Sequence, residues 1–186
     1  VFFVVDTAQS AGTIPLHMEE ACVDFLAFTG HKGLLGPQGV GGFLISDRLD
    51  GQMEPLIAGG TGSSSDSLDM PRTLPDKYES GTMNLPGIIG LHAALSYLER
   101  TGLETIRRRK LELTGYFLEE VKKLPSVRIA GRQGTERRVA VVSLDFEGRD
   151  NAVTAFRLEQ EYGIKTRVGL HCAPMAHRAL GTIPQG

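Results

Sequence analysis

The sequence has few cysteines, little net charge and no long apolar run, and each shortage excludes a class of protein. Cys22 and Cys172 are the only cysteines among its 186 residues, which excludes the disulfide framework of small secreted domains and favours a reducing, cytoplasmic setting. No uninterrupted apolar stretch approaches the roughly 18 residues of a membrane-spanning helix. The first residues, VFFVVD, lack the basic region of a signal peptide.

Charges of the two signs are nearly balanced. The formal net charge is −2, which argues against a nucleic-acid-binding surface. The one dense basic run, RRRK at 107–110, has Glu104 and Glu112 beside it, and this pattern is typical of a solvated helix face. Hydrophobic residues make up 41% and charged residues 23% of the chain, as in an ordinary soluble protein.

Both ends of the sequence are abrupt. It begins inside a strand-like run without an initiator methionine, and it stops in the turn-like sequence IPQG. We therefore expect a fragment of a longer protein.

Apolar runs rich in β-branched and aromatic residues predict three short strands in the first half of the chain. They are 1–5, 22–28 and 39–46, and Cys22 in the second is expected to be a core residue. Continuous apolar runs are typical of central strands in a sheet that helices cover, which predicts an α/β fold. The next segment, 57–87, is rich in Gly, Ser, Pro and Asp, and is either a functional loop or a disordered linker.

Helical periodicity alternates with strand signals in the second half. Two amphipathic helices, 87–100 and 103–124, are separated by Gly102. A smaller α+β unit follows, with strands at 127–131, 138–146 and 164–170 and a helix at 150–163. Asp150 and Gly163 are expected to cap that helix at its two ends.

The stretch FLAFTGHKGLLGPQGVGGFLI places Lys32 directly after an apolar run and among several glycines. We expect this lysine at the end of a strand, on a tight loop and partly desolvated. Desolvation favours the neutral amine, which can attack an aldehyde and form a Schiff base. Asp6 also ends an apolar run and could hold a protonated ring nitrogen. An imine-forming lysine and a carboxylate at the pyridinium are the two groups that pyridoxal phosphate requires.

Two motifs, DTAQSAG at 6–12 and TGHKGLLGPQG at 29–39, carry a family resemblance. The chain resembles the class V aminotransferase family of fold-type I pyridoxal-phosphate enzymes, and within it the cysteine desulfurase and selenocysteine lyase group. The resemblance implies a partial aspartate-aminotransferase-like fold of the α/β class. Residues 1–100 would be the C-terminal half of the large cofactor-binding domain, 101–125 a connecting long helix, and 126–186 an incomplete small C-terminal domain.

The resemblance also assigns cofactor-binding roles, one residue at a time. Lys32 would form the Schiff base and then act as the base at the substrate Cα. Asp6 would keep the pyridine nitrogen of pyridoxal 5'-phosphate protonated, and Gln9 would hydrogen-bond the ring hydroxyl. Thr29 and His31 would contact the phosphate.

A further motif, ESGTMN at 79–84, resembles the family's E-A-G-T-x-N. In the family its threonine reaches across to the phosphate of the partner subunit, so the resemblance assigns Thr82 to cofactor binding and implies a homodimer with shared active sites. The nearby glycines at 59–62 could be mistaken for a phosphate cradle. They lack a preceding strand and a following helix, so we interpret them as a flexible turn.

The sequence TRVGLHCAP at 166–174 resembles the segment with the reactive cysteine of desulfurases. Cys172 would attack the sulfur of L-cysteine and leave as a persulfide for a sulfur-acceptor protein, with L-alanine as product. Arg167 and His171 would favour the thiolate and contact the substrate. The alternatives are a buried core cysteine, or a zinc site of His171, Cys172 and His177 that has no second cysteine pair.

One departure from the family and two rival functions stay open. The family's arginine for the substrate carboxylate would fall just after Gly186. The same scaffold could carry an aminotransferase or a selenocysteine lyase, and replacing Cys172 by alanine would separate these from a desulfurase. Alternatively, the fragment is a catalytically empty dimerisation domain, because missing strands would leave an exposed sheet edge.

Overall fold

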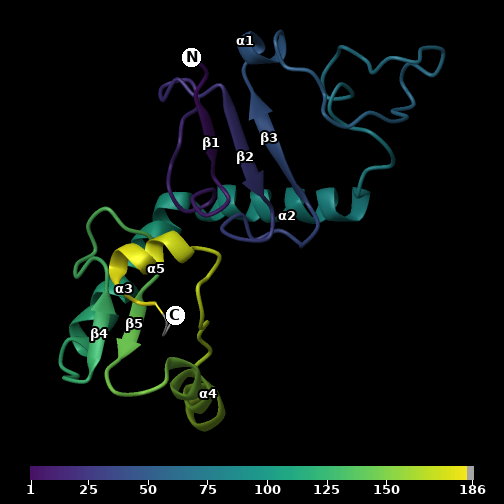
Figure 1. The fold of residues 1–186 in the computed structure, drawn as a ribbon. Coiled ribbons are helices and arrows are strands. Elements are labelled where there is room, and N and C mark those ends of the chain that lie inside the picture. The colour runs from purple at the N-terminus through teal and green to yellow at the C-terminus, as the bar shows by residue number, and fades with distance from the viewer. Residues whose placement is uncertain (184–186) are drawn as a thin grey trace. The chain divides into compact units, whose positions relative to one another are not determined.

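The computed structural model describes residues 1–183, and the chain divides into two compact units, Val1–Arg107 and Arg108–Gly186. The first unit holds a three-stranded sheet and the second a two-stranded sheet (Figure 1). In chain order the elements are β1 (Val4–Asp6), β2 (Phe25–Thr29), β3 (Gly41–Ile45), α1 (Asp47–Asp50), α2 (Leu85–Thr101), α3 (Leu103–Val121), β4 (Val127–Ala130), β5 (Ser143–Phe146), α4 (Asn151–Tyr162) and α5 (Pro174–Leu180). The mixed α/β character that the sequence predicts is confirmed.

The sheet of the first unit has the order β1-β2-β3. Strand β1 runs parallel to β2, with Asp6 opposite Ala27, and β3 runs antiparallel to β2, with Gly41 opposite Thr29. The expected strand 1–5 is shorter than predicted, and it is not buried, because Val4 is 61% exposed and lies in the edge strand. Apolar composition alone cannot distinguish an edge strand from a central one.

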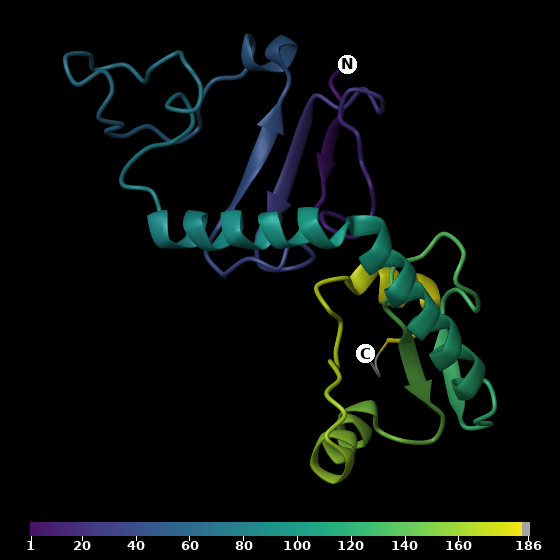
Figure 2. The ribbon, with the colours of Figure 1, turned by 180° about the vertical axis from the view of Figure 1, so that it is seen from behind.

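Helix α2 crosses one face of this sheet (Figure 2). Its N-terminus is capped by Asn84, whose Oδ1 accepts a hydrogen bond from the Gly87 amide at 3.1 Å, and it ends at Gly102 as predicted. Leu91, buried on this helix, lies against the loop after β2, where Gly30 and Gly36 leave room for its side chain. A methyl group on Gly36 would lie 2.9 Å from Leu91 Cδ1.

Asp24 anchors the opposite end of the sheet from the carboxyl end of β1. Its buried carboxylate accepts hydrogen bonds from the Phe3 amide, the Ser46 hydroxyl and the Arg48 guanidinium, the shortest being 2.5 Å. The hydrogen bonds from Arg48 and then Phe3 lower the pKa of Asp24 to about 2. One charged side chain thus joins the start of β1, the start of β2 and the N-cap of α1.

The second unit packs helix α3 against the β4-β5 hairpin. Leu118, Val121 and Ile129 form its buried core, since apolar residues on one face of α3 meet the inner face of β4. Helix α4 begins after Asp150, which accepts hydrogen bonds from the amides of Ala152 and Val153, and it ends at Gly163 in the left-handed conformation. Both predicted caps are confirmed.

Several predicted boundaries and the predicted burial of Cys22 are wrong. Residues 164–170 form no strand, the strand in 138–146 is confined to Ser143–Phe146, and α3 ends at Val121, before Pro125. Cys22 is exposed rather than a core residue, because the chain turns there with φ of 52° before β2 begins. Among residues 1–183, no helix is long and apolar enough to cross a membrane.

Candidate functional site

The candidate cofactor residues of the first unit lie at one edge of the sheet. Because β1 and β2 are parallel, their carboxyl ends meet at the same edge. Asp6 is the last residue of β1, Thr29 is the last residue of β2, and Lys32 follows three residues later. The topology therefore brings together side chains that are far apart in the sequence.

The loop after β1 is fixed by its first residues. Thr7 is buried, and its hydroxyl donates to the Ala27 carbonyl at 2.6 Å, while its amide donates to the same oxygen at 2.8 Å. Asp6 Oδ1 accepts from the Ala8 amide at 2.8 Å, which orients the carboxylate. Gln9 is exposed on the turn that follows. Asp6 and Gln9 are thus presented from a short segment that is attached to β2.

The turn with Lys32 is closed by main-chain hydrogen bonds. The Gly36 amide donates to Gly30 O at 2.8 Å, and the Gly30 amide donates to Val40 O at 2.9 Å. The expected tight loop after a strand is confirmed. The expected desolvation of the amine is not, because Lys32 and the adjacent His31 are exposed.

Two glycines bring the loops after β1 and β2 into direct contact. Gly12 has φ of 75°, and a methyl group there would overlap the carbonyl of Gly33, while one on Gly33 would overlap Ala11 O. Only residues without a Cβ allow two backbones this close. This contact fixes the loop with Gln9 relative to the turn with Lys32.

Thr29 and His31 form a polar pair beside Lys32. Thr29 Oγ1 lies 3.0 Å from His31 Nδ1, and the tautomer of the imidazole decides which group donates. A hydroxyl and an imidazole N–H can both donate to a phosphate oxygen. The pair therefore offers the kinds of donor that an anion-binding site uses.

The segment with Thr82 connects to the same turn through Asn84. Asn84 Nδ2 donates to Gly39 O at 3.1 Å, and Thr82 itself is exposed two residues earlier. Asn84 was absent from the predicted site. An asparagine before Leu85-Pro86 is a helix-start signature, so the sequence contained the signal.

The residues predicted to handle sulfur lie in the second unit. Cys172 is exposed, and both His171 and Cys172 adopt left-handed φ values, of 51° and 61°. His171 Nε2 lies 3.1 Å from Arg167 O, and since a carbonyl can only accept, this nitrogen carries the proton. The turn thus presents the thiol just before α5 and is tied back to Arg167.

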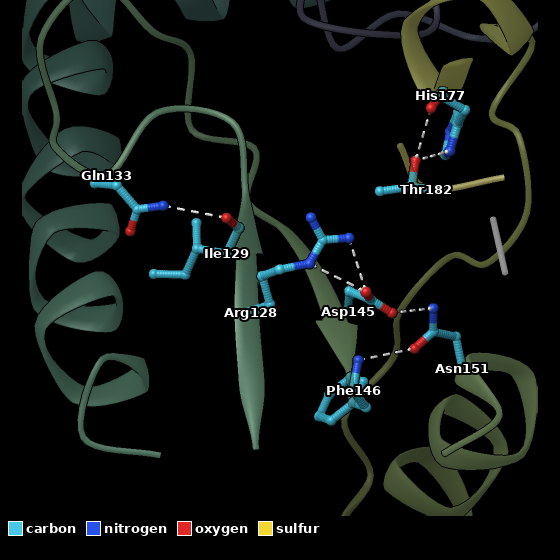
Figure 3. A network of polar contacts seen from close by, with 8 residues as sticks. All are labelled: Arg128, Ile129, Gln133, Asp145, Phe146, Asn151, His177 and Thr182. Atoms are coloured by element: carbon cyan, nitrogen blue, oxygen red, sulfur yellow. Dashed lines mark hydrogen bonds and ion pairs between the residues drawn. The ribbon is translucent and has the colours of Figure 1, made fainter. Parts of the chain in front are cut away.

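A second histidine supports this turn. The rings of His171 and His177 lie edge to face with centroids 5.8 Å apart. His177 Nδ1 lies 2.8 Å from the hydroxyl of buried Thr182 (Figure 3). Within residues 1–183, no group of three or more His, Cys, Asp or Glu side chains could hold a metal ion, so the zinc alternative has no geometric support.

A polar network in the same unit links the hairpin to α4 (Figure 3). Arg128 Nη2 donates to Asp145 Oδ2 at 2.9 Å, and Asn151 Nδ2 donates to Asp145 Oδ1 at 3.2 Å. The hydrogen bonds from Arg128 and then Asn151 hold the pKa of Asp145 below its ordinary value. This network is structural, and it joins β4, β5 and the first turn of α4.

The donor set at the edge of the first sheet fits pyridoxal phosphate. That cofactor needs an amine for its aldehyde, a carboxylate for its pyridinium nitrogen and donors for its phosphate. The adjacent loops offer all three: the amine of Lys32, the carboxylate of Asp6, and the donors of the Thr29–His31 pair. The chemistry of the residues present is therefore compatible with the group.

Comparison with known proteins identifies a family for the chain. Residues 1–183 match the family model described as aminotransferase class-V. A probable cysteine desulfurase of Methanothermobacter thermautotrophicus is 34% identical over 182 residues, which cover 96% of this chain and 45% of the relative. The chain thus spans less than half the length of this curated relative.

The chain is also similar to solved structures of cysteine desulfurase and of C-DES. The apo structure of cysteine desulfurase from Thermococcus onnurineus NA1 matches with a TM-score of 0.85 and 35% identity, covering 97% of this chain and 45% of that chain. A C-DES variant with glycine covalently linked to the pyridoxal-phosphate cofactor matches with a TM-score of 0.72 and 25% identity, covering 87% of this chain and 42% of that chain. The chain belongs to the aminotransferase class-V family.

Proposed function

We propose that the protein is a pyridoxal-phosphate-dependent cysteine desulfurase, which releases sulfur from L-cysteine as a persulfide on Cys172 and leaves L-alanine. The observation that carries the proposal is the gathering of Asp6, Thr29 and Lys32 at one edge of the sheet, at the carboxyl ends of two parallel strands. In this proposal residues 1–100 belong to the large cofactor-binding domain, 101–125 form the connecting helix and 126–186 belong to the small domain.

Each residue has a defined task in the first unit. Lys32 holds the cofactor through its amine, and it takes the proton from the substrate Cα when the amine is free. When bound, pyridoxal phosphate supplies an electron sink for the negative charge that develops at that carbon. Asp6 keeps a proton on the pyridine nitrogen, and Gln9 hydrogen-bonds the ring hydroxyl. Thr29 and His31 donate to the phosphate.

Cys172 performs the sulfur step. Its thiolate attacks the substrate sulfur, so that an S–S bond forms, the substrate Cβ–S bond breaks and the electron pair passes to Cβ, which is later protonated to the methyl group of alanine. Arg167 and His171 support the thiolate and the substrate. Thr82 would donate to the phosphate in a second copy of the chain, which requires a homodimer, and a sulfur-acceptor protein would remove the persulfide in the cytoplasm.

The exposed position of Cys172 supports this assignment, because a sulfur donor must reach both a substrate and an acceptor. Cys22 is also exposed, so it provides a matched control within the same chain. A Cys22→Ser variant should retain sulfur release from L-cysteine, and Cys172→Ser should lose it. Equal loss in both variants would contradict the assignment.

Absorption spectroscopy tests the cofactor. Titration with pyridoxal phosphate should produce a visible band that shifts when L-cysteine is added, and Lys32→Ala should abolish the band. If neither this chain nor a longer form that spans the full length of its relatives gives a band, the pyridoxal-phosphate assignment is wrong. If the band forms and Cys172→Ala still releases sulfur from L-cysteine, the protein is an enzyme of another kind on this scaffold, such as an aminotransferase or a selenocysteine lyase.

A second candidate function is a dimerisation domain without catalysis. Large apolar side chains of α2 are exposed, including Leu85 at 61%, Ile89 at 61% and Tyr97 at 51%. Exposed apolar surface of this kind favours association. Concentration-dependent oligomers without cofactor binding would support this candidate.

A further inference from the structure

The exposed Thr82 lies on a short segment that is attached to the first unit at both ends. The segment 79–83 runs between Tyr78, which contacts the region after β3, and Asn84, which contacts the residue two positions before β3. Most of the preceding stretch, from residue 57 onward, has no regular secondary structure. The attachments therefore decide where Thr82 can reach.

The first attachment is a buried ionic contact. Lys77 is only 8% exposed, and its Nζ donates to Asp50 Oδ1 at 3.0 Å and to Asp50 O at 2.7 Å. Tyr78 donates its hydroxyl to the same Asp50 oxygen at 2.8 Å, and it lies 3.2 Å from Met53 O. These hydrogen bonds, first from Tyr78 and then from Lys77, hold the pKa of Asp50 below its ordinary value, so the carboxylate is charged at neutral pH.

Aromatic packing fixes the direction of this attachment. The Tyr78 ring meets Phe43 of β3 edge to face, with centroids 5.4 Å apart, and Phe43 stacks on Phe25 of β2 at 4.7 Å. Such ring pairs add to the energy of apolar burial and restrict orientation. Tyr78 is thus held both by its hydroxyl and by its ring.

The second attachment begins at Asn84. Its side chain accepts from the Gly87 amide and donates to Gly39 O, so one residue starts helix α2 and also binds the end of the turn with Lys32. Between the two attachments, the Gly81 amide donates to Gly60 O at 2.8 Å, with Gly81 at φ of 82°. Thr82 follows at once, between this hydrogen bond and the contacts of Asn84.

We infer that Asp50, Lys77 and Tyr78, together with Asn84, form a two-ended clamp that positions Thr82 for a phosphate group. The inference rests on the proposed function, since it takes the phosphate of pyridoxal phosphate bound to a second copy as the ligand of Thr82. Lys77, Tyr78 and Asn84 are positioning residues, because they act through the segment that they hold. A buried lysine in a polar loop is explained by this role.

The test compares binding of pyridoxal phosphate with binding of pyridoxal, which has the aldehyde and ring but no phosphate. The Tyr78→Phe variant removes the hydroxyl, whose single proton is directed at Asp50 Oδ1 with Met53 O as a more distant acceptor, and it keeps the ring that packs on Phe43. We expect it to weaken binding of pyridoxal phosphate about tenfold, the loss that one or two hydrogen bonds explain, and to leave binding of pyridoxal unchanged. Lys77→Met should act in the same direction, and Lys77→Arg should restore most of the affinity.

Hydrogen exchange gives a readout that needs no ligand. The Gly81 amide should exchange about tenfold faster in Tyr78→Phe than in wild type, because the segment then opens more often. Lys122→Met is the matched control, since Lys122 also pairs with a carboxylate, Glu119 at 2.7 Å, but on the exposed surface just after the end of α3. It should change neither measurement.

The outcomes separate this inference from the proposed function. If neither wild type nor a longer form that spans the full length of its relatives binds either compound, the proposed function is wrong, and exchange at Gly81 alone decides whether the clamp exists. If wild type binds pyridoxal phosphate, and Tyr78→Phe binds both compounds as wild type does with unchanged exchange, the clamp is refuted. Equal weakening for both compounds would also refute it, because a general loss of structure does not select the phosphate.

Discussion

Replacing Gly12 by alanine tests whether the contact between two loops holds the candidate site together. Gly12 has φ of 75°, and a methyl group there would overlap the backbone of Gly33, next to Lys32. Gly62 is the matched control, because it has a similar φ of 82° and nothing within 4 Å of the position its methyl group would take. The two substitutions share the conformational cost and differ in the steric one.

The expected magnitudes follow from these two costs. A left-handed conformation costs a residue with a Cβ roughly 1–2 kcal/mol, which applies at both positions. Forcing an extra carbon into a filled space costs about 1–3 kcal/mol more, and this applies at Gly12 alone, where the obstacle is backbone that cannot rotate away. Gly12→Ala should therefore lower the free energy of unfolding by about 2–5 kcal/mol, and Gly62→Ala by about 1–2 kcal/mol.

Urea denaturation measures both values, and titration with pyridoxal phosphate measures the effect on the site. Because the displaced backbone is next to Lys32, Gly12→Ala should also weaken cofactor binding at least about tenfold, whereas Gly62→Ala should not. If the two variants lose equal stability and bind the cofactor equally well, the loops do not depend on this contact and the reasoning is refuted.

Three further predictions concern the framework. Leu118 is 1% exposed, and Leu118→Ala should lower the free energy of unfolding by about 2–5 kcal/mol. Leu113 on the same helix is 50% exposed, and Leu113→Ala should lower it by less than about 0.5 kcal/mol. Urea denaturation measures both values. The pKa of Asp24 is about 2 in the folded protein, against an ordinary value of 3.8. Its contribution to the free energy of unfolding is therefore complete above pH ~4 and is lost as the pH falls toward 2. Urea midpoints between pH 7 and 2 should show this loss in wild type, and a wild-type-like acid dependence in Asp24→Asn would contradict it. Asp150→Ala should cost about 1 kcal/mol, because two amides of α4 lose their partner, and an unchanged melting temperature would show that the cap is not needed.

Local chemistry explains what the sequence predicted correctly. Asp150 and Gly163 bound α4, Gly102 ends α2, and Lys32 lies on a turn just after a strand, because caps, glycines and strand ends act on neighbours a few residues away. The motifs with Asp6 and Lys32 also indicated the family, since each motif is continuous in the chain.

Tertiary structure decided the features that depend on distant partners. Residues 164–170 have strand-like composition but form no strand, because a strand exists only when another strand pairs with it. Cys22 begins the apolar run of 22–28 and is nevertheless exposed on a turn. Lys77 looks like a solvated loop lysine, and it is buried because Asp50 and Tyr78 meet it in the fold. The sequence by itself determined the caps, the turns and the chemical groups available. Burial, and the meeting of Asp6, Gly12 and Lys32 at one edge of the sheet, depended on the packing of strands and loops. The physical reason is that these contacts join residues that no local interaction brings together.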